Sequence, residues 1–155
     1  MSDPVNAADL PALVGREFGP SSWLEVTQER IDRFADATED RQFIHVDAER
    51  ASRTPLGGTI AHGFLTLSLQ PHLMAEISPR VDNLVMGINY GIDTLRFLQP
   101  VRSGSRVRSR QVVLEATEKN PGQWLLKSRI TVEIEDQQRP ALIADMLALY
   151  VVGAG

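Results

Sequence analysis

Residues 36–72 read DATEDRQFIHVDAERASRTPLGGTIAHGFLTLSLQPH and contain all three histidines of the chain. The later part of this stretch continues into an apolar run, and residues 60–75 are apolar on nearly all sides of a helix. This pattern predicts a buried helix in which Pro71, near the end, kinks or tightens the last turns. A helix that is buried all round needs a surrounding layer, so the fold depends on what the rest of the chain can wrap around it.

After Pro79 the hydrophobic period changes from that of a helix to the period of two that is typical of strands. Strands are predicted over 84–98, 106–116, 123–135 and 140–152, with tight turns at 120–122 and 136–139. The clearest alternation places Ile130, Val132 and Ile134 in the core. An antiparallel sheet wrapped around a central buried helix is the α+β arrangement called the hot-dog fold. We expect residues 1–155 to form a single domain of this kind.

The first third of the chain is expected to be less regular. Residues before Pro20 are interpreted as a lead-in, and 22–26 alternates as a short strand does. Helices are predicted over 28–37 and 48–53, since Thr27 and Asp47 are good N-cap residues.

Composition excludes several classes of function. A formal charge of −4 and a pI near 5.4 argue against general affinity for nucleic acid, which basic patches drive. The absence of cysteine excludes disulfides, thiolate nucleophiles and cysteine metal sites. No apolar run approaches the ~20 residues that span a bilayer, and the N-terminus lacks the pattern of a signal peptide. We therefore expect a cytoplasmic protein that does not bind membranes.

Asp40 and His45 are the candidate reactive pair. A carboxylate and an imidazole so close in sequence can converge on one water molecule only if the backbone between them is bent. On a regular helix the two side chains would point well apart, and on a strand the odd spacing would place them on opposite faces. The sequence therefore predicts a bent connection here.

Three blocks of sequence occur in a recognisable order. The first is Asp40, His45 and Ala51, the second is Ala61-His62-Gly63, and the third is RFLQPV at 96–101. This order resembles the MaoC-like dehydratases, also called (R)-specific enoyl-CoA hydratases or hydratase 2 proteins, and within them the nodulation protein N-like branch. The likeness runs from about Thr27 to Tyr150.

The chain departs from the family pattern just before His45. Glu39 stands where the family has glycine, and it places a second carboxylate beside Asp40. Gln42 and Phe43 stand where the family has asparagine and proline.

The resemblance implies a hydro-lyase that adds water reversibly to trans-2-enoyl-CoA and gives (3R)-3-hydroxyacyl-CoA. Asp40 and His45 would act on the water, and the amide of Gly63 would bind the thioester oxygen with His62 nearby. No metal or redox cofactor is expected, because this reaction requires none. Coenzyme A would enter as part of the thioester substrate. The resemblance also implies a homodimer joined through the sheets.

Other interpretations stay open at this point. The protein could be an acyl-carrier-protein dehydratase, a hot-dog thioesterase or a non-catalytic subunit that binds acyl thioesters. Asp40 could be a solvated loop residue, His45 and Gly63 could serve packing, and His62 could be a buried hydrogen-bonded histidine. The sequence does not determine acyl chain length, carrier, direction, or which of Asp40 and His45 is the base.

Two further sets of residues have two interpretations each. The first set lies on one strand face and could contact phosphates of coenzyme A or form a solvated face: Arg106, Arg108 and Arg110. The second set could line an acyl tunnel or belong to the core: Trp23, Phe43 and Phe64.

Overall fold

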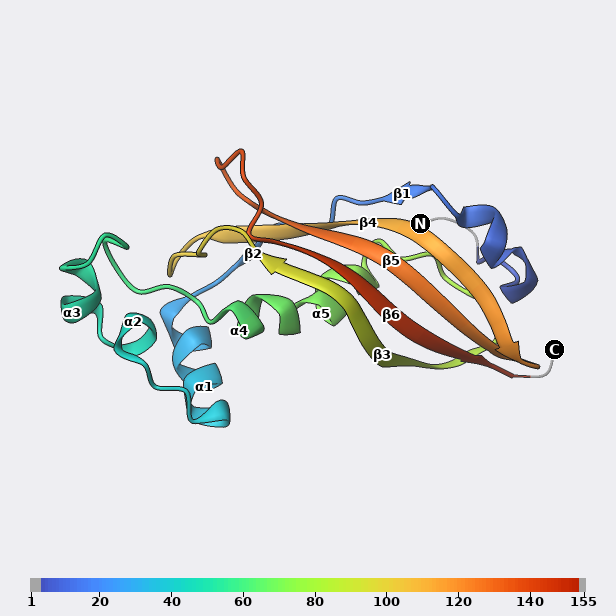
Figure 1. The fold of residues 1–155 in the computed structure, drawn as a ribbon, viewed down its shortest axis with the longest axis horizontal. Helices are drawn as coiled ribbons and strands as arrows, with labels where there is room; N and C mark the ends of the chain where they lie inside the picture. The colour runs from blue at the N-terminus through green and yellow to red at the C-terminus, as the bar shows by residue number, and fades with distance from the viewer. Residues whose placement is uncertain (1–3, 154–155) are drawn as a thin grey trace.

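The computed structural model describes residues 4–153 and shows one antiparallel sheet that curves over two short helices (Figure 1). The strands are β1 Glu17–Phe18, β2 Leu24–Glu25, β3 Leu84–Phe97, β4 Arg106–Asn120, β5 Gln123–Ile134 and β6 Leu142–Val152. The helices are the 3-10 helix η1 Ala7–Leu13 and the α-helices α1 Gln28–Thr38, α2 Phe43–Val46, α3 Ala48–Ser52, α4 Gly63–Ser68 and α5 Gln70–Ala75. No helix within residues 4–153 is long and apolar enough to cross a membrane.

The sheet has the order β1-β4-β5-β6-β3, and β2 pairs with β4 beyond β1. The four long strands fall where the sequence predicted them, and the β4–β5 hairpin closes at Gly122, whose φ of 74° is in the left-handed region that suits glycine. Ile130, Val132 and Ile134 are buried as predicted. β3 pairs with β6 alone, so it forms an edge of the sheet.

The main core lies between this sheet and the α4–α5 segment. Leu65, Leu69 and Leu73 follow one another at helical spacing and pack in one cluster with buried residues of β4, β5 and β6. This arrangement confirms the predicted hot-dog fold. Figure 1 shows α4 and α5 under the sheet, with α1, α2 and α3 gathered at one end.

The central helix differs from its prediction in three respects. It begins at Gly63 instead of residue 60, and it divides at Leu69 into two short helices. Pro71 explains the division, because proline has no N–H to continue the helical hydrogen bonds. The prediction of burial on all sides was wrong for the single chain, since Phe64, Ser68 and His72 are exposed along one face.

The N-terminal region contains more structure than a lead-in. η1 packs Leu10 and Leu13 into a second cluster with Trp124 and Leu126, and β1 adds to the sheet. The expected strand at 22–26 is reduced to the two residues of β2. The side chains of Thr27 and Asp47 cap α1 and α3 as predicted, with the cap oxygens accepting from backbone N–H groups at 3.2 and 2.9 Å.

Glu39 ends α1 in the left-handed conformation, with a φ of 62°. This conformation costs about 1–2 kcal/mol for a residue with a Cβ, and glycine does not carry this cost. We expect Glu39→Gly to raise the free energy of unfolding by about 1 kcal/mol and Tm by about 2–4 °C. Urea and thermal unfolding measure both quantities. Glu39→Ala is the control, because a similar gain there would mean that the charge, and not the backbone, is responsible.

Candidate active site

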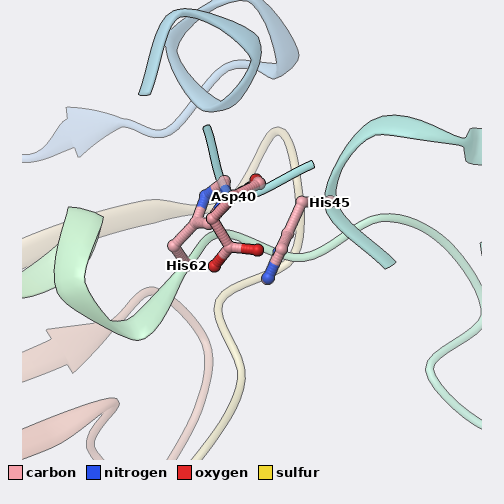
Figure 2. A group of neighbouring side chains, drawn as sticks. All are labelled: Asp40, His45 and His62. Atoms are coloured by element: carbon pink, nitrogen blue, oxygen red, sulfur yellow. The ribbon is translucent and has the colours of Figure 1, made fainter. Parts of the chain in front are cut away.

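The connection between α1 and α2 brings Asp40 close to His45. The chain turns at Glu39, passes through Asp40 without regular structure, and then enters α2, a single helical turn that carries His45. A carboxylate oxygen of Asp40 and one ring nitrogen each of His45 and His62 lie within 4.8 Å of one another. Figure 2 shows the Asp40 carboxylate and the two imidazole rings gathered in one place. The structure therefore contains the bent connection that the sequence predicted.

The surroundings of His45 select one tautomer of its neutral imidazole. Its side chain is buried, and Nδ1 lies 2.7 Å from the carbonyl oxygen of Ile60. A carbonyl oxygen can only accept a hydrogen bond, so Nδ1 carries the proton. In the neutral ring Nε2 therefore keeps its lone pair, which makes it a proton acceptor.

The pKa of His45 is lowered from the ordinary histidine value. The main cause is burial, which disfavours the charged imidazolium. The Ile60 carbonyl and the Asp40 charge act in the opposite direction, and His62 lowers the pKa further. His45 therefore favours the neutral form that a general base requires.

His62 contacts both Asp40 and His45. Its ring stacks on that of His45 with centroids 3.7 Å apart, and Nε2 donates to the backbone carbonyl of Asp40 at 2.8 Å. The ring also lies against Phe34, with centroids 4.9 Å apart. Within residues 4–153, Nδ1 of His62 is the buried side-chain polar atom without a hydrogen-bond partner. These contacts agree with the interpretation of His62 as a buried, hydrogen-bonded histidine.

Asp40, His45 and His62 have the residue types of a metal site, but the two rings are poorly arranged for one. A metal lies in the plane of each imidazole ligand, about 2.0–2.1 Å from its nitrogen. The two rings are stacked with only 22° between their planes, so the planes run side by side and do not meet at a point between them. The cluster is better suited to proton transfer.

Gly63 and His45 line a cavity of about 420 Å³ at the start of α4. Gly63 is the first residue of this helix, so its N–H has no acceptor within the helix. A Cβ at Gly63 would lie 2.9 Å from the ring of Phe97, which explains why the position needs glycine. Asp40 and His62 are not among the lining residues of this cavity. Asp40 is exposed to solvent beside it.

The three sequence blocks meet around this cavity. Phe97 and Pro100 of the third block line it, and the carbonyl of Val101 accepts from the N–H of Ala61 at 2.7 Å. The N–H of Ile60 donates to the carbonyl of Ile44 at 3.0 Å, which ties the segment before α4 to α2. Residues far apart in sequence therefore fix the backbone that precedes Gly63.

Sequence reasoning missed Gln28 on α1. Its Nε2 donates to the carbonyl of His45 at 2.7 Å, and its Oε1 accepts from the hydroxyl of Thr59. One amide thus connects α1, α2 and the segment before α4. No sequence signal identified it, because glutamine in the first turn of a helix is common on surfaces.

The three arginines considered for phosphate binding are paired with carboxylates of their own chain. Arg106 pairs with Glu135, and Arg108 and Arg110 both pair with Glu133. The structure therefore favours the interpretation of a polar strand face.

Of the three aromatic residues considered for an acyl tunnel, Phe64 lines the cavity. Its ring lies edge-on to Phe97, with centroids 5.8 Å apart. Phe43 instead lies under the guanidinium of Arg50, and Trp23 lies under that of Arg108. Both therefore contribute to cation–π contacts away from this cavity.

The lowered pKa of His45 predicts a pH dependence of stability. A histidine whose folded-state pKa is depressed contributes fully above its unfolded value of about 6.5, and the contribution is lost as pH falls through the folded-state pKa. We expect the free energy of unfolding of the wild type to fall more steeply between about pH 7 and 5 than that of His45→Gln. Urea unfolding at several pH values measures the difference. Parallel curves would contradict the assignment.

Comparison with curated proteins gives relatives over nearly the whole chain. The nodulation protein N of Rhizobium leguminosarum bv. viciae is 47% identical over 146 residues, covering 94% of this chain and 91% of that protein. The 3-hydroxyacyl-thioester dehydratase Z of Mycobacterium tuberculosis is 42% identical over 146 residues, covering 94% of this chain and 96% of that protein. The name of this second relative agrees with the sequence-based prediction of a hydro-lyase.

Solved structures and a family model agree with this result. A monoamine oxidase regulatory protein from Archaeoglobus fulgidus superposes with a TM-score of 0.79 at 24% identity, covering 99% of this chain and 98% of that one. The R-hydratase PhaJ1 from Pseudomonas aeruginosa superposes with a TM-score of 0.71 at 23% identity, covering 95% and 86%. These likenesses show the fold. The model of the MaoC like domain matches residues 9–136, and the chain therefore belongs to the MaoC-like dehydratase family.

Proposed function

We propose that this protein is an (R)-specific enoyl-CoA hydratase, which adds water reversibly to trans-2-enoyl-CoA and gives (3R)-3-hydroxyacyl-CoA. The observation that carries the proposal is the convergence of the Asp40 carboxylate and the His45 imidazole within 4.8 Å, beside the cavity that His45 and Gly63 line. A hydration needs an oriented water, a base, and a donor for the thioester oxygen. The site offers a group for each task.

His45 is the proposed base. Its Nε2 takes a proton from the water while the water oxygen forms a bond to C3 of the enoyl thioester. The electron pair of the C2–C3 double bond moves towards the thioester carbonyl, and the resulting imidazolium returns the proton to C2. One water is consumed and no proton is left over. Positioned acid–base groups of this kind typically contribute 10²–10⁴-fold to the rate.

Asp40 is proposed to orient the same water and to stabilise the imidazolium that forms on His45. Its exposed carboxylate can accept a hydrogen bond from the water, and it lies within 4.8 Å of the imidazole. His62 is proposed as a positioning residue, because it bonds the backbone of Asp40 and stacks on His45.

The N–H of Gly63 is proposed to bind the thioester oxygen, on which negative charge develops as the enolate forms. A preorganised backbone donor is effective there because it needs no rearrangement during the reaction. The missing side chain lets the thioester approach the N–H closely. The mechanism requires no metal or redox group, and coenzyme A enters as part of the substrate.

We propose that two copies pair through β3. This edge strand exposes a row of large apolar residues, namely Leu84, Val85, Met86, Ile88, Tyr90, Ile92 and Phe97. An exposed apolar edge strand is a ready template for pairing with another chain. A homodimer would cover this edge and the exposed face of α4, which lies beside the cavity.

We expect Asp40→Asn and His45→Gln each to lower kcat for trans-2-enoyl-CoA hydration by about 10²–10⁴-fold while the protein stays folded. Loss of enoyl-thioester absorbance measures the rate, and circular dichroism checks the fold. Asp9→Asn and His72→Gln are matched controls, because both residues are exposed and lie outside the site. Near-normal turnover in either dyad variant would overturn the assignment, and release of free thiol would indicate a thioesterase instead.

We expect the wild type to sediment as a dimer and Ile88→Lys to shift it to a monomer, because a charge on the edge strand opposes its burial. Analytical ultracentrifugation measures the change. Val14→Lys is the control, since Val14 is similarly exposed but lies off β3, and this variant is expected to remain dimeric. A dimer that persists in Ile88→Lys would place the interface elsewhere.

A further inference from the structure

A second cavity of about 360 Å³ lies under the sheet at the far end of the central helix. Part of its wall is apolar, with Met74 of α5, Leu126 and Ile130 of β5 and Met146 of β6. The rest is polar. Six uncharged hydrogen-bonding side chains also line it, namely Gln70, Ser78, Asn89, Gln111, Ser128 and Tyr150.

Ser78, Gln111 and Ser128 form one hydrogen-bonded group, and Gln70 belongs to a second group with Ser109. Ser78 donates to Oε1 of Gln111 at 3.0 Å, and Nε2 of Gln111 donates to the hydroxyl of Ser128 at 2.9 Å. On the other side, Nε2 of Gln70 donates to the carbonyl of Thr66 at 3.0 Å, and Ser109 donates to its Oε1 at 2.6 Å. Gln70 is fully buried, so these positions hold polar groups where apolar side chains would ordinarily fill a core.

These two groups leave several donor hydrogens unused. The hydroxyl hydrogen of Ser128 has no acceptor within residues 4–153, and the amides of Gln70 and Gln111 each use one of their two hydrogens. The lining is also nearly free of charge. Among the described residues only the exposed Arg80 on its rim is charged, and burial raises the pKa of the Tyr150 phenol, which keeps it neutral. The cavity is therefore suited to a neutral group with an acceptor oxygen.

The cavity and the candidate active site lie along the same helical segment, α4 and α5. Three hollows follow one another along the helix: the first contains Gly63 and Thr66, the second contains Leu67, Ser68 and Pro71, and the third is the polar cavity with Gln70, Pro71 and Met74. Gly63 and Gln70 are seven positions apart, which is about 10 Å along a helix. An extended chain covers this length in about nine bonds, because three backbone bonds of an extended peptide span ~3.3–3.6 Å.

We propose that the polar cavity receives an oxygen-bearing acyl tail, so that the preferred substrates are medium-chain 2-enoyl thioesters with a hydroxyl or keto group near the far end of the chain. This inference rests on the proposed hydratase function and narrows its substrate class. A plain hydrocarbon tail would displace water from the spare donors without replacing its hydrogen bonds. A hydroxyl or keto oxygen accepts from them.

The test compares trans-2-decenoyl-CoA with the same thioester carrying a hydroxyl on its last carbon. The wild type is expected to show a kcat/KM about tenfold higher for the hydroxylated substrate, because its hydroxyl accepts from a buried donor that the plain chain would leave without a partner. Equal values, or a preference for the plain chain, would overturn the proposal.

Two serine variants locate the effect. Ser128→Ala removes a donor that lines the cavity, and it is expected to lower the preference while hydration of the plain substrate continues. Ser109→Ala is the matched control, since it removes a buried hydroxyl that bonds Gln70 and does not line the cavity. It is expected to keep the preference. An equal loss in both variants would show that the loss of a buried hydroxyl in this region, and not contact with the tail, sets the preference, and would overturn the proposal.

A short substrate separates this inference from the proposed function. trans-2-Butenoyl-CoA cannot reach the polar cavity, so its hydration by the wild type and both serine variants tests the dyad alone. If no enoyl thioester is hydrated, the hydratase proposal fails. Calorimetric binding of decanoyl-CoA and its terminally hydroxylated analogue then still tests the cavity. Tighter binding of the hydroxylated thioester supports the inference, and equal or weaker binding overturns it.

Discussion

The candidate site depends on the hydrogen bond between Nδ1 of His45 and the carbonyl of Ile60. This bond fixes which nitrogen of His45 carries the proton, and it joins α2 to the segment that leads into α4. The carbonyl is itself held in place, because the N–H groups of Ile60 and Ala61 bond to Ile44 and Val101. The position of the imidazole and the position of the Gly63 amide are thus set by one piece of backbone. A base and an oxyanion donor need this kind of shared support, since small displacements between them would cost rate.

The hot-dog arrangement explains why the site lies at the beginning of the central helix. The sheet covers one face of α4 and α5 and buries their leucines, but it leaves the first turn of α4 open to the segments that carry Asp40 and His45. The same half-wrapped helix leaves Phe64 and the apolar residues of β3 exposed. The open side of the helix and the unpaired edge of the sheet both result from a sheet that covers only one face of the helix.

The buried polar side chains around Gln70 and Gln111 are unusual for a protein core. Amide and hydroxyl groups gain little net stability from internal hydrogen bonds, because water satisfies them equally well in the unfolded chain. Their burial beside a cavity is therefore better explained by what the cavity holds than by stability. The hydrogen bond from Ser109 to Gln70 also joins α5 to β4 of the sheet.

The sequence by itself determined the strands, the capped helices and the wrapped central helix, and it predicted Asp40, His45 and Gly63 as the candidate site. These features follow from local periodicity, cap chemistry and the order of three motifs, all of which are written in neighbouring residues. Only the tertiary structure decided the tautomer of His45, the link through Gln28 and the pairing of the arginines with Glu133 and Glu135. Each of these depends on contacts between residues that are distant in the chain or on competition between neighbouring hydrogen bonds. η1 was missed for the same reason, because its leucines gain their stability from packing against Trp124 and Leu126 more than a hundred positions away.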